Sequence, residues 1–371
     1  MSGKIIHVIT QMEAAGAQGA AVRNAKAMRA AGVDSHTVFL YVKRPAYLGE
    51  PGVVALLDHK PRGVADLLRI LVRLFRHFRR NRDAAVIAYT HYANVICGIV
   101  GRLAGVRRVV ASHRNPANTY PGWCRKVDLA LGTLGAYSSA IAVSETVYES
   151  FRDHPARYRK RLVVVRNGIE IGGYAPDKER TEDHAGSHER PIRFVTAGRL
   201  HHQKNQSVIV RAIKSLDNAS LVIAGEGDLR ADLENLIRSE GLESKVSLIG
   251  EIKPSEVREL LATADVFLFP SKYEAFGFSV VEAMAAGCPV ICSDIPAMRE
   301  VVADAGLLVP PFDVPAWVEA MQRVAMDTSL RKEMRRRSIE RARLFSLGTM
   351  VEGYMRAART APASSPVSVS P

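Results

Sequence analysis

The chain has 371 residues, of which 47% are hydrophobic and 24% are charged. This balance is typical of a soluble globular protein and excludes a collagen-like, coiled-coil or wholly disordered chain. The length is too great for one ordinary domain and comfortable for two, and no run of about 18 apolar residues predicts a membrane-spanning helix.

The net charge of +13 belongs to the first half of the chain. Residues 1–170 hold 26 Lys and Arg against 11 Asp and Glu, a balance of +15, whereas residues 171–371 hold 25 against 27, a balance of −2. This asymmetry predicts an anionic partner for the first half: a membrane surface, a phosphorylated acceptor or nucleic acid. The alternative is a basic composition spread over all surfaces.

The amino-terminal apolar run, Ile5–Ile9, reaches Glu13 too soon for a signal peptide. The chain has four cysteines and no CxxC pair: Cys97, Cys124, Cys288 and Cys292. We interpret them as buried free thiols of a reducing cytosol rather than as zinc ligands. The expected location is therefore the cytoplasm, and no metal site is expected.

Short apolar strands alternate with longer amphipathic stretches, a pattern typical of βαβ units and parallel sheets. In the first half six segments have strand character: Ile5–Ile9, His36–Val42, Ala85–Thr90, Arg108–Ser112, Ala140–Val143 and Leu162–Val165. Three stretches between them have helical character: Ala17–Ala31, Val64–Arg80 and Arg125–Ser138. We therefore predict a first α/β domain over residues 1–170.

Residues 171–190 form a polar stretch that predicts a linker, and beyond it the alternation restarts. The strands expected there are Arg193–Ala197, Ser220–Ala224, Val246–Ile249, Val266–Phe269 and Val290–Cys292. We predict a second α/β domain over residues 191–345, a C-terminal helix over 346–360 that returns to the first domain, and a disordered tail over 361–371. Two successive doubly wound domains face each other across a cleft at the carboxyl ends of their strands.

The most informative segment reads SKYEAFGFSVVEAMAAGCPVICSDIP and follows an apolar strand. Glu274 lies in the loop after that strand, and Glu282 lies eight residues later on the following helix. Between them, Phe276, Gly277 and Phe278 form a turn that opens a helix N-terminus, where free N–H groups favour an anion. The two carboxylates suit the hydroxyl groups of a sugar on each side of a phosphate. The alternative is a solvated helix residue and an ordinary loop charge.

A second segment, GRLHHQKN, connects a strand to a helix and holds Arg199 and Lys204 five residues apart. Two cations at the carboxyl end of a strand suit a pyrophosphate, because arginine forms a bidentate fork and lysine acts as a point charge. A third segment, VIAGEGD, ends a strand in a Gly-rich turn that lets the backbone approach a ligand. Each segment alone is also compatible with an ordinary surface.

With these three segments in this order, the chain resembles glycosyltransferase family four, the retaining GT-B enzymes. Three further segments add to the resemblance: VVVRNGIE (163–170), VSLIGE (246–251) and GLLVPP (306–311). The resemblance implies the α/β GT-B fold, two Rossmann-like doubly wound domains facing across a cleft. It also implies that the first domain binds the acceptor and that the second binds a nucleotide sugar.

The resemblance also implies residue roles. Arg199 and Lys204 would bind the donor diphosphate, Glu274 the hydroxyls of the donor sugar, and Glu282 the ribose. The amides of the Phe276–Phe278 turn would line the sugar and the phosphate. The expected border of the nucleobase is formed by Gly250, Glu251 and Ile252.

In the first half the resemblance is looser. Gly16 lies in an AGAQG turn and fits a close approach of backbone to phosphate, but Gln18 stands where an acidic residue is common. His91 and His113 each follow a strand, and the resemblance places His113 near the reacting centre. It assigns no role to His91, and a histidine at a strand end is often structural.

The sequence contains no Asp-x-Asp pair, which a metal-held diphosphate would favour. We therefore expect a metal-independent, retaining transferase with no cofactor and a nucleotide sugar, with UDP as the favoured nucleotide, as co-substrate. The expected acceptor is a glycan or lipid-linked molecule of cell-surface polysaccharide or glycolipid synthesis. Alternatives are a soluble small-molecule acceptor, a phosphorylase-like or epimerase-like GT-B enzyme, and a basic nucleic-acid-binding protein, for which no nucleic-acid motif is found.

The stretch ADLLRILVRLFRHFRRNR places four arginines on one face of a helix, since they recur at steps of four, three and four: Arg69, Arg73, Arg76 and Arg80. Leucine and phenylalanine fill much of the rest, which is typical of a helix at an anionic membrane surface. We expect the apolar side to pack on the sheet and the arginines to dock on the inner leaflet. The alternative is that the arginines face water only.

Overall fold

The computed structural model describes residues 3–13, 16–174, 190–274 and 276–359. The chain divides into two compact units, the first formed by Met1–Asn167 together with the segment from Leu347, and the second by Gly168–Ser346. Most of the predicted linker, residues 175–189, and all of the predicted tail lie outside the described residues. Each unit is considered by itself below.

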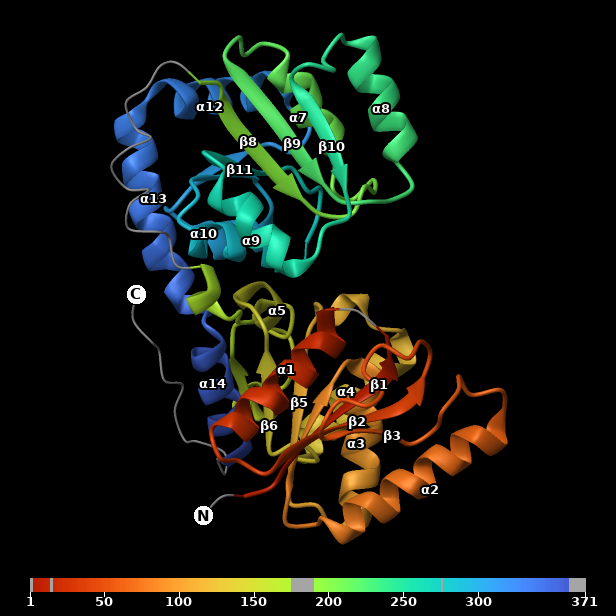
Figure 1. The fold of residues 1–371 in the computed structure, drawn as a ribbon. Helices are drawn as coiled ribbons and strands as arrows, with labels where there is room; N and C mark the ends of the chain where they lie inside the picture. Colours follow the sequence, from red (N-terminus) through yellow and green to blue (C-terminus); the bar gives the residue numbers. More distant parts are fainter. Residues whose placement is uncertain (1–2, 14–15, 175–189, 275, 360–371) are drawn as a thin grey trace. The chain divides into compact units, whose positions relative to one another are not determined.

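In the part of the chain that the structure describes, the first unit contains one sheet of seven parallel strands (Figure 1). In order across the sheet they are β3 (Val53–Ala55), β2 (Ser35–Val42), β1 (Ile5–Met12), β4 (Ala85–Tyr89), β5 (Arg108–His113), β6 (Ser139–Ala142) and β7 (Leu162–Val164). The chain moves from β1 outward to β3 and then returns to β4, so its direction reverses between β1 and β4. In such sheets ligands bind outside the carboxyl ends of the strands near the reversal.

Helices connect these strands, as expected for a doubly wound sheet. They are α1 (Gly16–Ala30), α2 (Val64–Arg80), α3 (His91–Ala104), α4 (Gly122–Leu134), α5 (Glu145–Glu149) and α6 (Ala156–Arg159). Both α3 and α4 end at a glycine in the left-handed region, Gly105 and Gly135, each with φ 81°. A glycine adopts this conformation without a steric penalty, and it ends the helix there.

Helix α2 is buried along a narrow stripe of four side chains: Asp66, Ile70, Leu74 and Phe78. The expected packing of the apolar side holds for Ile70, Leu74 and Phe78, which join the core of the first sheet, and not for the rest of that side. Leu67, Leu68, Leu71 and Phe75 are exposed instead. They lie outside the buried row 66–70–74–78, whose members share one face because residues four apart lie on the same side of a helix.

The last helix, α14 (Leu347–Arg359), belongs to the core of the first unit although the second unit lies between them in the sequence. The ring of Tyr354 stacks on that of Tyr89 in β4, with centroids 5.7 Å apart and an interplanar angle of 8°. Its hydroxyl is hydrogen-bonded to Oγ of Ser112 in β5 at 2.9 Å. The helix is therefore packed on the centre of the first sheet.

The described residues of the second unit form a sheet of six parallel strands. In order they are β10 (Val246–Gly250), β9 (Ala219–Ala224), β8 (Ile192–Ala197), β11 (Val266–Phe269), β12 (Val290–Ser293) and β13 (Leu307–Val309). The helices are α7 (Gln206–Ile213), α8 (Arg230–Ser239), α9 (Pro254–Ala262), α10 (Phe278–Ala285), α11 (Pro296–Val302), α12 (Val314–Met326) and α13 (Thr328–Ala342). Both units are thus doubly wound and Rossmann-like, which confirms the predicted fold class.

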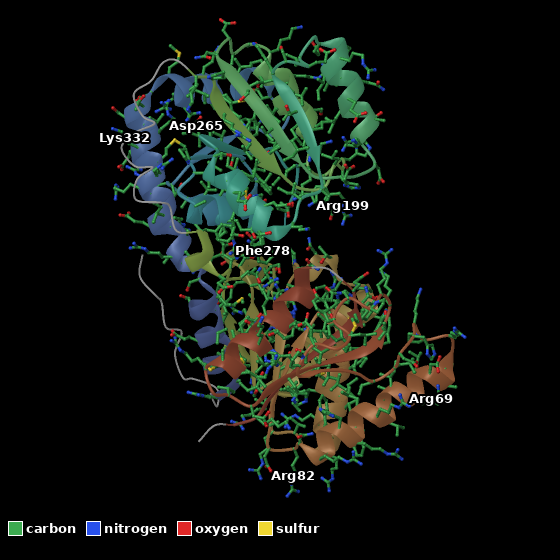
Figure 2. All side chains as sticks on the ribbon, in the orientation of Figure 1. Arg69, Arg82, Arg199, Asp265, Phe278 and Lys332 are labelled. Atoms are coloured by element: carbon green, nitrogen blue, oxygen red, sulfur yellow. The ribbon has the colours of Figure 1, made fainter. Side chains whose placement is uncertain are left out.

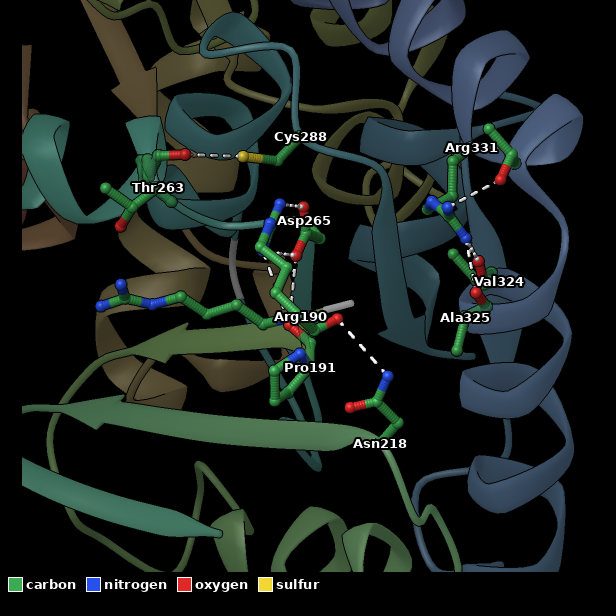
Figure 3. A network of polar contacts seen from close by, with 12 residues as sticks. Arg190, Pro191, Asn218, Thr263, Asp265, Cys288, Val324, Ala325 and Arg331 are labelled. Carbon is green, nitrogen blue, oxygen red and sulfur yellow. Dashed lines mark hydrogen bonds and ion pairs between the residues drawn. The ribbon is translucent and has the colours of Figure 1, made fainter. Parts of the chain in front are cut away.

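A polar network fixes the amino end of the central strands of this second sheet (Figure 3). Arg190 donates to both carboxylate oxygens of Asp265 at 2.8 and 2.7 Å, and Asp265 also accepts from the backbone N–H of Arg193 at 2.8 Å. Asp265 directly precedes β11, and Arg193 lies in β8. The network therefore ties these two neighbouring strands together at the edge opposite their carboxyl ends.

Candidate active site

Four loops of the second unit follow the carboxyl ends of the neighbouring strands β10, β9, β8 and β11. They carry the segments GEI, GEGD, GRLHHQK and SKYE, which the sequence singled out. Carboxyl ends of parallel strands meet at one edge of a sheet, so these loops lie together. Arg199, from the loop after β8, and Phe278, at the start of α10, are labelled in Figure 2.

Two glycines let the loops after β8 and β9 touch through their backbones. A Cβ atom at Gly225 would lie 2.0 Å from the carbonyl oxygen of Gly198, and one at Gly227 would lie 2.3 Å from that of Leu200. Both glycines have positive φ, 145° and 159°. No other residue fits these positions, so the Gly-rich turn is required to hold the segment that contains Arg199 against β9.

Lys204 and Glu274 form an ion pair across the loops after β8 and β11. The same carboxylate oxygen of Glu274 accepts a hydrogen bond from Nε2 of Gln203 at 3.1 Å. The Lys204 ammonium also lies 4.9 Å from the centroid of the Phe269 ring. The two charged side chains are 22% and 14% exposed, so the pair is largely shielded but reachable from solvent. The sequence had assigned them to different parts of one ligand, and the structure brings them together.

Arg199 is exposed, and its guanidinium makes no hydrogen bond or ion pair with any residue that the structure describes. Its backbone is held in place, since the carbonyl oxygen of Arg199 accepts a bond from Nε2 of Gln206 at 3.0 Å. An exposed guanidinium on a fixed backbone keeps all of its N–H donors available for an anion.

Gly277 caps the amino end of α10 in the left-handed conformation, with φ 89° and ψ 59°. The positive φ is what requires glycine here, whereas the Cε of Met298, 2.5 Å from where a Cβ atom would lie, is the end of a flexible side chain that could move. The buried ring of Phe276 meets the rings of Phe278 and Phe345 edge to face, at 4.9 and 5.6 Å. These contacts hold the first turn of α10, whose free N–H groups form an anion-favouring helix end.

Glu282, in the second turn of α10, lies beside Tyr174, a residue that the sequence did not single out. Burial raises the pKa of Tyr174 to about 12, and the nearby negative charge of Glu282 adds to the effect. The Arg258 guanidinium lies 5.1 Å from the centroid of the Tyr174 ring. Tyr174 thus lies beside both Glu282 and Arg258, and it brings together distant segments in a way that no local pattern predicts.

The residues expected at the nucleobase border follow β10. Gly250 has φ 78°, and a Cβ atom there would lie 3.2 Å from Oε1 of Glu226 in the neighbouring loop. Glu226 is paired with Arg230 of α8. Glu251 is exposed, whereas Ile252 is half-buried and packs on the core of the unit.

Gly16 and His113 belong to the first unit. Gly16 is the first residue of α1, which follows β1, a strand inside that sheet between β2 and β4. Gln18, in place of the common acidic residue, is buried. The structure thus puts Gly16 at a helix start on the carboxyl side of β1.

His113 ends β5 and has no solvent-exposed surface. Its Nδ1 lies 3.0 Å from the hydroxyl of Tyr120, and its Nε2 lies 2.9 Å from that of Tyr158. Tyr158 and Tyr137 both donate to the buried carboxylate of Asp128, at 2.7 and 2.9 Å. Burial lowers the pKa of His113, so the ring is neutral at pH 7. The histidine is therefore the centre of a buried network rather than an open surface group.

All four arginines of the α2 stripe, Arg69, Arg73, Arg76 and Arg80, are exposed. Arg69, labelled in Figure 2, donates to Asp66 at 2.6 Å, and Arg73 donates to the carbonyl oxygen of Leu56. None of the helices in the described ranges is long and apolar enough to cross a bilayer. The described residues also hold no group of three or more His, Cys, Asp or Glu side chains that could bind a metal ion.

A family model described as glycosyl transferases group 1 matches residues 177–344. The chain is 30% identical over 265 residues to the Bacillus subtilis protein named glycosyltransferase EpsF, which covers 65% of this chain and 66% of that protein. It is 34% identical over 127 residues to O-antigen chain mannosyltransferase B of Escherichia coli, or 34% of this chain and 33% of that protein. The chain spans between about one third and two thirds of the length of the curated relatives it matches.

Solved structures match over nearly the whole chain. The Anabaena protein HepE in complex with UDP superposes with a TM-score of 0.80 at 18% identity, covering 95% of this chain and 98% of that one. At this identity the likeness concerns the fold, and it confirms the predicted GT-B class of two Rossmann-like domains.

Proposed function

Because the chain belongs to the glycosyl transferases group 1 family, we propose that it transfers a sugar from a nucleotide-sugar donor to a glycan or lipid-linked acceptor. One observation carries the proposal: Lys204 and Glu274, 70 residues apart, pair at the sheet edge that also presents Arg199 and the start of α10. A cationic pair, a carboxylate and a helix N-terminus suit the diphosphate and the sugar of such a donor.

The diphosphate is bound by Arg199, Lys204 and the first turn of α10. An ammonium has three N–H donors, so Lys204 can stay paired with Glu274 while it donates to a phosphate oxygen. Together these groups offset the negative charge that develops on the departing nucleoside diphosphate. This arrangement makes transfer metal-independent.

The remaining contacts with the donor are made at the same carboxyl edge of the second sheet. Glu274 accepts hydrogen bonds from hydroxyls of the donor sugar, and Glu282, beside the Tyr174 hydroxyl, accepts them from the ribose. The nucleobase lies along the loop after β10, formed by Gly250, Glu251 and Ile252.

Transfer proceeds with retention of the anomeric configuration. The acceptor oxygen bonds to the anomeric carbon on the face from which the diphosphate leaves, the bond from that carbon to the phosphate oxygen breaks, and the departing oxygen takes the acceptor proton. Both ring nitrogens of His113 are buried against tyrosine hydroxyls, which favours a positioning role in which the ring orients Tyr120 and Tyr158.

The donor nucleotide is UDP, a choice supported by the likeness of the fold to HepE, which was solved with UDP. The acceptor is a glycan or lipid-linked molecule of cell-surface polysaccharide or glycolipid synthesis, as the name of the E. coli relative suggests. A soluble small-molecule acceptor is the second candidate. The enzyme works in the cytoplasm.

The first unit docks on the inner face of the plasma membrane through α2. Two features of this helix support the proposal: the exposed arginine stripe and the exposed apolar ridge formed by Leu67, Leu68, Leu71 and Phe75. Arginines attract anionic headgroups, and apolar side chains beside them suit the boundary between headgroups and acyl chains. A membrane-held acceptor is thereby presented to the enzyme.

The test is a thermal-shift screen with UDP-glucose, UDP-galactose, UDP-N-acetylglucosamine and GDP-mannose, followed by assay of the stabilising donor. A ligand at about 100 times its Kd stabilises the folded state by about 2.7 kcal/mol. We expect a UDP-sugar to raise Tm in the wild type and not in Arg199→Ala. Anomeric configuration in the product is read by NMR. If no nucleotide sugar raises Tm, the proposal is wrong.

A further inference from the structure

An exposed aromatic cluster in the first unit has no role in the donor contacts described above. The rings of Tyr92 and Trp123 stack with centroids 6.0 Å apart at 28°, and the ring of His91 lies 4.1 Å from that of Tyr92. Trp123 is 58% exposed and Tyr92 is 38% exposed. Trp317, the second of the chain's two tryptophans, is fully buried. An indole left open to solvent is thus a distinctive feature of this surface.

The cluster lies at the carboxyl edge of the first sheet. His91 opens α3 two residues after the end of β4, and Trp123 is the second residue of α4, which follows β5. The two strands are neighbours and parallel. Sγ of Cys124 lies 3.7 Å from the carbonyl oxygen of His91, which ties the starts of the two helices together. This edge is where ligands bind in doubly wound sheets.

The backbone of Thr90, directly before His91, has a strained conformation. Thr90 has φ 93° and ψ 148°, although its branched side chain disfavours positive φ. A hydrogen bond of 2.8 Å between the hydroxyls of Thr90 and Thr10, at the end of β1, holds this conformation. Conformations of this kind persist where the surroundings impose them, and they gather at ligand sites.

His91 adds unused polar groups beside the aromatic faces. Neither of its ring nitrogens has a hydrogen-bond partner among the residues that the structure describes. Burial lowers its pKa, against the opposing charge of Asp128, so the half-buried ring is neutral at pH 7. A neutral imidazole offers one N–H donor and one acceptor nitrogen.

The geometry points to a subsite for a hexopyranose ring of the acceptor, with its C–H face stacked on Trp123 and Tyr92 and its hydroxyls hydrogen-bonded to His91. A pyranose combines an apolar C–H face with polar edges, and the face of an aromatic ring is electron-rich and attracts C–H groups. The inference rests on the proposed function, because it gives the acceptor its sugar-binding residues. Trp123, Tyr92 and His91 are then specificity residues for the acceptor, separate from the donor contacts.

The first experiment uses Trp317→Phe, which leaves Trp123 as the one tryptophan. Its fluorescence is titrated with methyl α- and β-glycosides of glucose, galactose, mannose and N-acetylglucosamine, and separately with vesicles containing phosphatidylglycerol. We expect a saturable emission change with at least one glycoside, abolished by adding His91→Ala. A response to vesicles alone would identify the cluster as a membrane contact and overturn the proposal, as would no response at all.

The second experiment does not depend on replacing the buried Trp317. In full turnover, Trp123→Ala is expected to raise the acceptor KM about tenfold or more, the size of one aromatic stacking contact, while the donor KM changes less than twofold. Leu134→Ala is the matched control, because Leu134 lies on the same helix and is 74% exposed. Its two KM values should equal those of the wild type.

The two proposals fail in different ways. If nucleotide sugars raise Tm and are turned over, yet Trp123→Ala leaves the acceptor KM unchanged, the aromatic subsite alone is wrong. If no nucleotide sugar raises Tm, the proposed function is wrong and the subsite falls with it.

Discussion

The hydroxyl of Tyr158 donates a 2.7 Å hydrogen bond to Oδ2 of Asp128 at a place where neither side chain reaches solvent. Removing this hydroxyl in Tyr158→Phe leaves the buried carboxylate with the Tyr137 hydroxyl alone and deprives Nε2 of His113 of its partner. Unpaired buried polar groups cost about 1–3 kcal/mol each. We expect Tyr158→Phe to lower the free energy of unfolding by about that amount, measured in urea.

The control is Tyr148→Phe, since Tyr148 is only partly buried and its hydroxyl bonds to no residue in the described ranges. Its free energy of unfolding should change by less than about 0.5 kcal/mol. An equal fall in the free energy of unfolding in the two variants would show that the hydrogen bonds of Asp128 do not stabilise the fold.

Glu274→Gln and Arg199→Ala should each remove most turnover while the fold stays intact. Both side chains lie in loops at the carboxyl ends of the strands rather than in a core, so the fold should stay intact. Losing one preorganised charge partner typically costs on the order of 100-fold in rate. Turnover with the stabilising donor and far-UV circular dichroism measure the two effects. Arg238→Ala, an exposed change on α8, is the control, and near-full activity in Glu274→Gln would refute the donor assignment.

Turnover should survive EDTA. The reason is the cationic donor edge, where Arg199, Lys204 and the first turn of α10 oppose the charge of the diphosphate without a divalent ion. Initial rates are compared in excess EDTA, in magnesium and in manganese. Activity lost in EDTA and restored only by a divalent ion would contradict the metal-free mechanism.

Acid should destabilise the first unit through its buried histidines. Burial lowers the pKa of His7 from 6.5 to about 3, and burial together with the nearby His77 lowers that of His36 to about 4. Below pH 6.5 the unfolded chain binds more protons than the folded one, so stability is complete above that pH. It is lost as the pH falls from 6.5 toward 4 for His36 and toward 3 for His7.

Urea unfolding between pH 7 and pH 4 measures this loss, which for the fully buried His7 approaches about 1.4 kcal/mol per pH unit. His36→Gln should weaken the dependence of the free energy of unfolding on pH. His202 is exposed, so His202→Gln should leave that dependence unchanged. A free energy of unfolding that stays constant down to pH 4.5 would be inconsistent with neutral buried histidines.

Replacing the four stripe arginines of α2 by glutamine should abolish co-sedimentation with anionic liposomes, because each contributes roughly 1 kcal/mol near such a surface. A control of equal charge loss changes four exposed cations elsewhere in the first unit to glutamine: Arg152, Arg157, Arg159 and Lys160. The control should bind like the wild type. Equal partitioning of both variants, or no wild-type binding at low salt, would end the docking proposal.

The order of the elements could be predicted from the sequence because buried parallel strands are nearly continuous apolar runs. The expected Val266–Phe269 coincides with β11, and the expected Val64–Arg80 coincides with α2. β3 was missed, since three partly exposed residues leave no such run. α3 was also missed, because its many buried positions obscure a helical period.

The site was predictable only where local motifs carry it. Arg199 and Lys204 lie in one short segment whose meaning the resemblance supplies, but their proximity to Glu274 depends on the order of strands across the sheet. The contacts of His113 with its partners and of Tyr174 with Glu282 join residues far apart in the sequence. Such contacts produce no periodic pattern from which they could be predicted. Likewise, an amphipathic pattern shows that α2 has an apolar side but not how much of it a neighbour covers.

The position of α14 has a consequence for how the protein is made. A ribosome completes Met1–Asn167 long before it reaches Leu347–Arg359. Until then the first unit lacks helix α14, which contacts Tyr89 and Ser112. Throughout translation of the second unit, the apolar surface that later receives Met350, Val351 and Tyr354 has no permanent cover. Cells must therefore protect this surface during synthesis, and a chain cut off before Leu347 would be a natural client of chaperones and proteases.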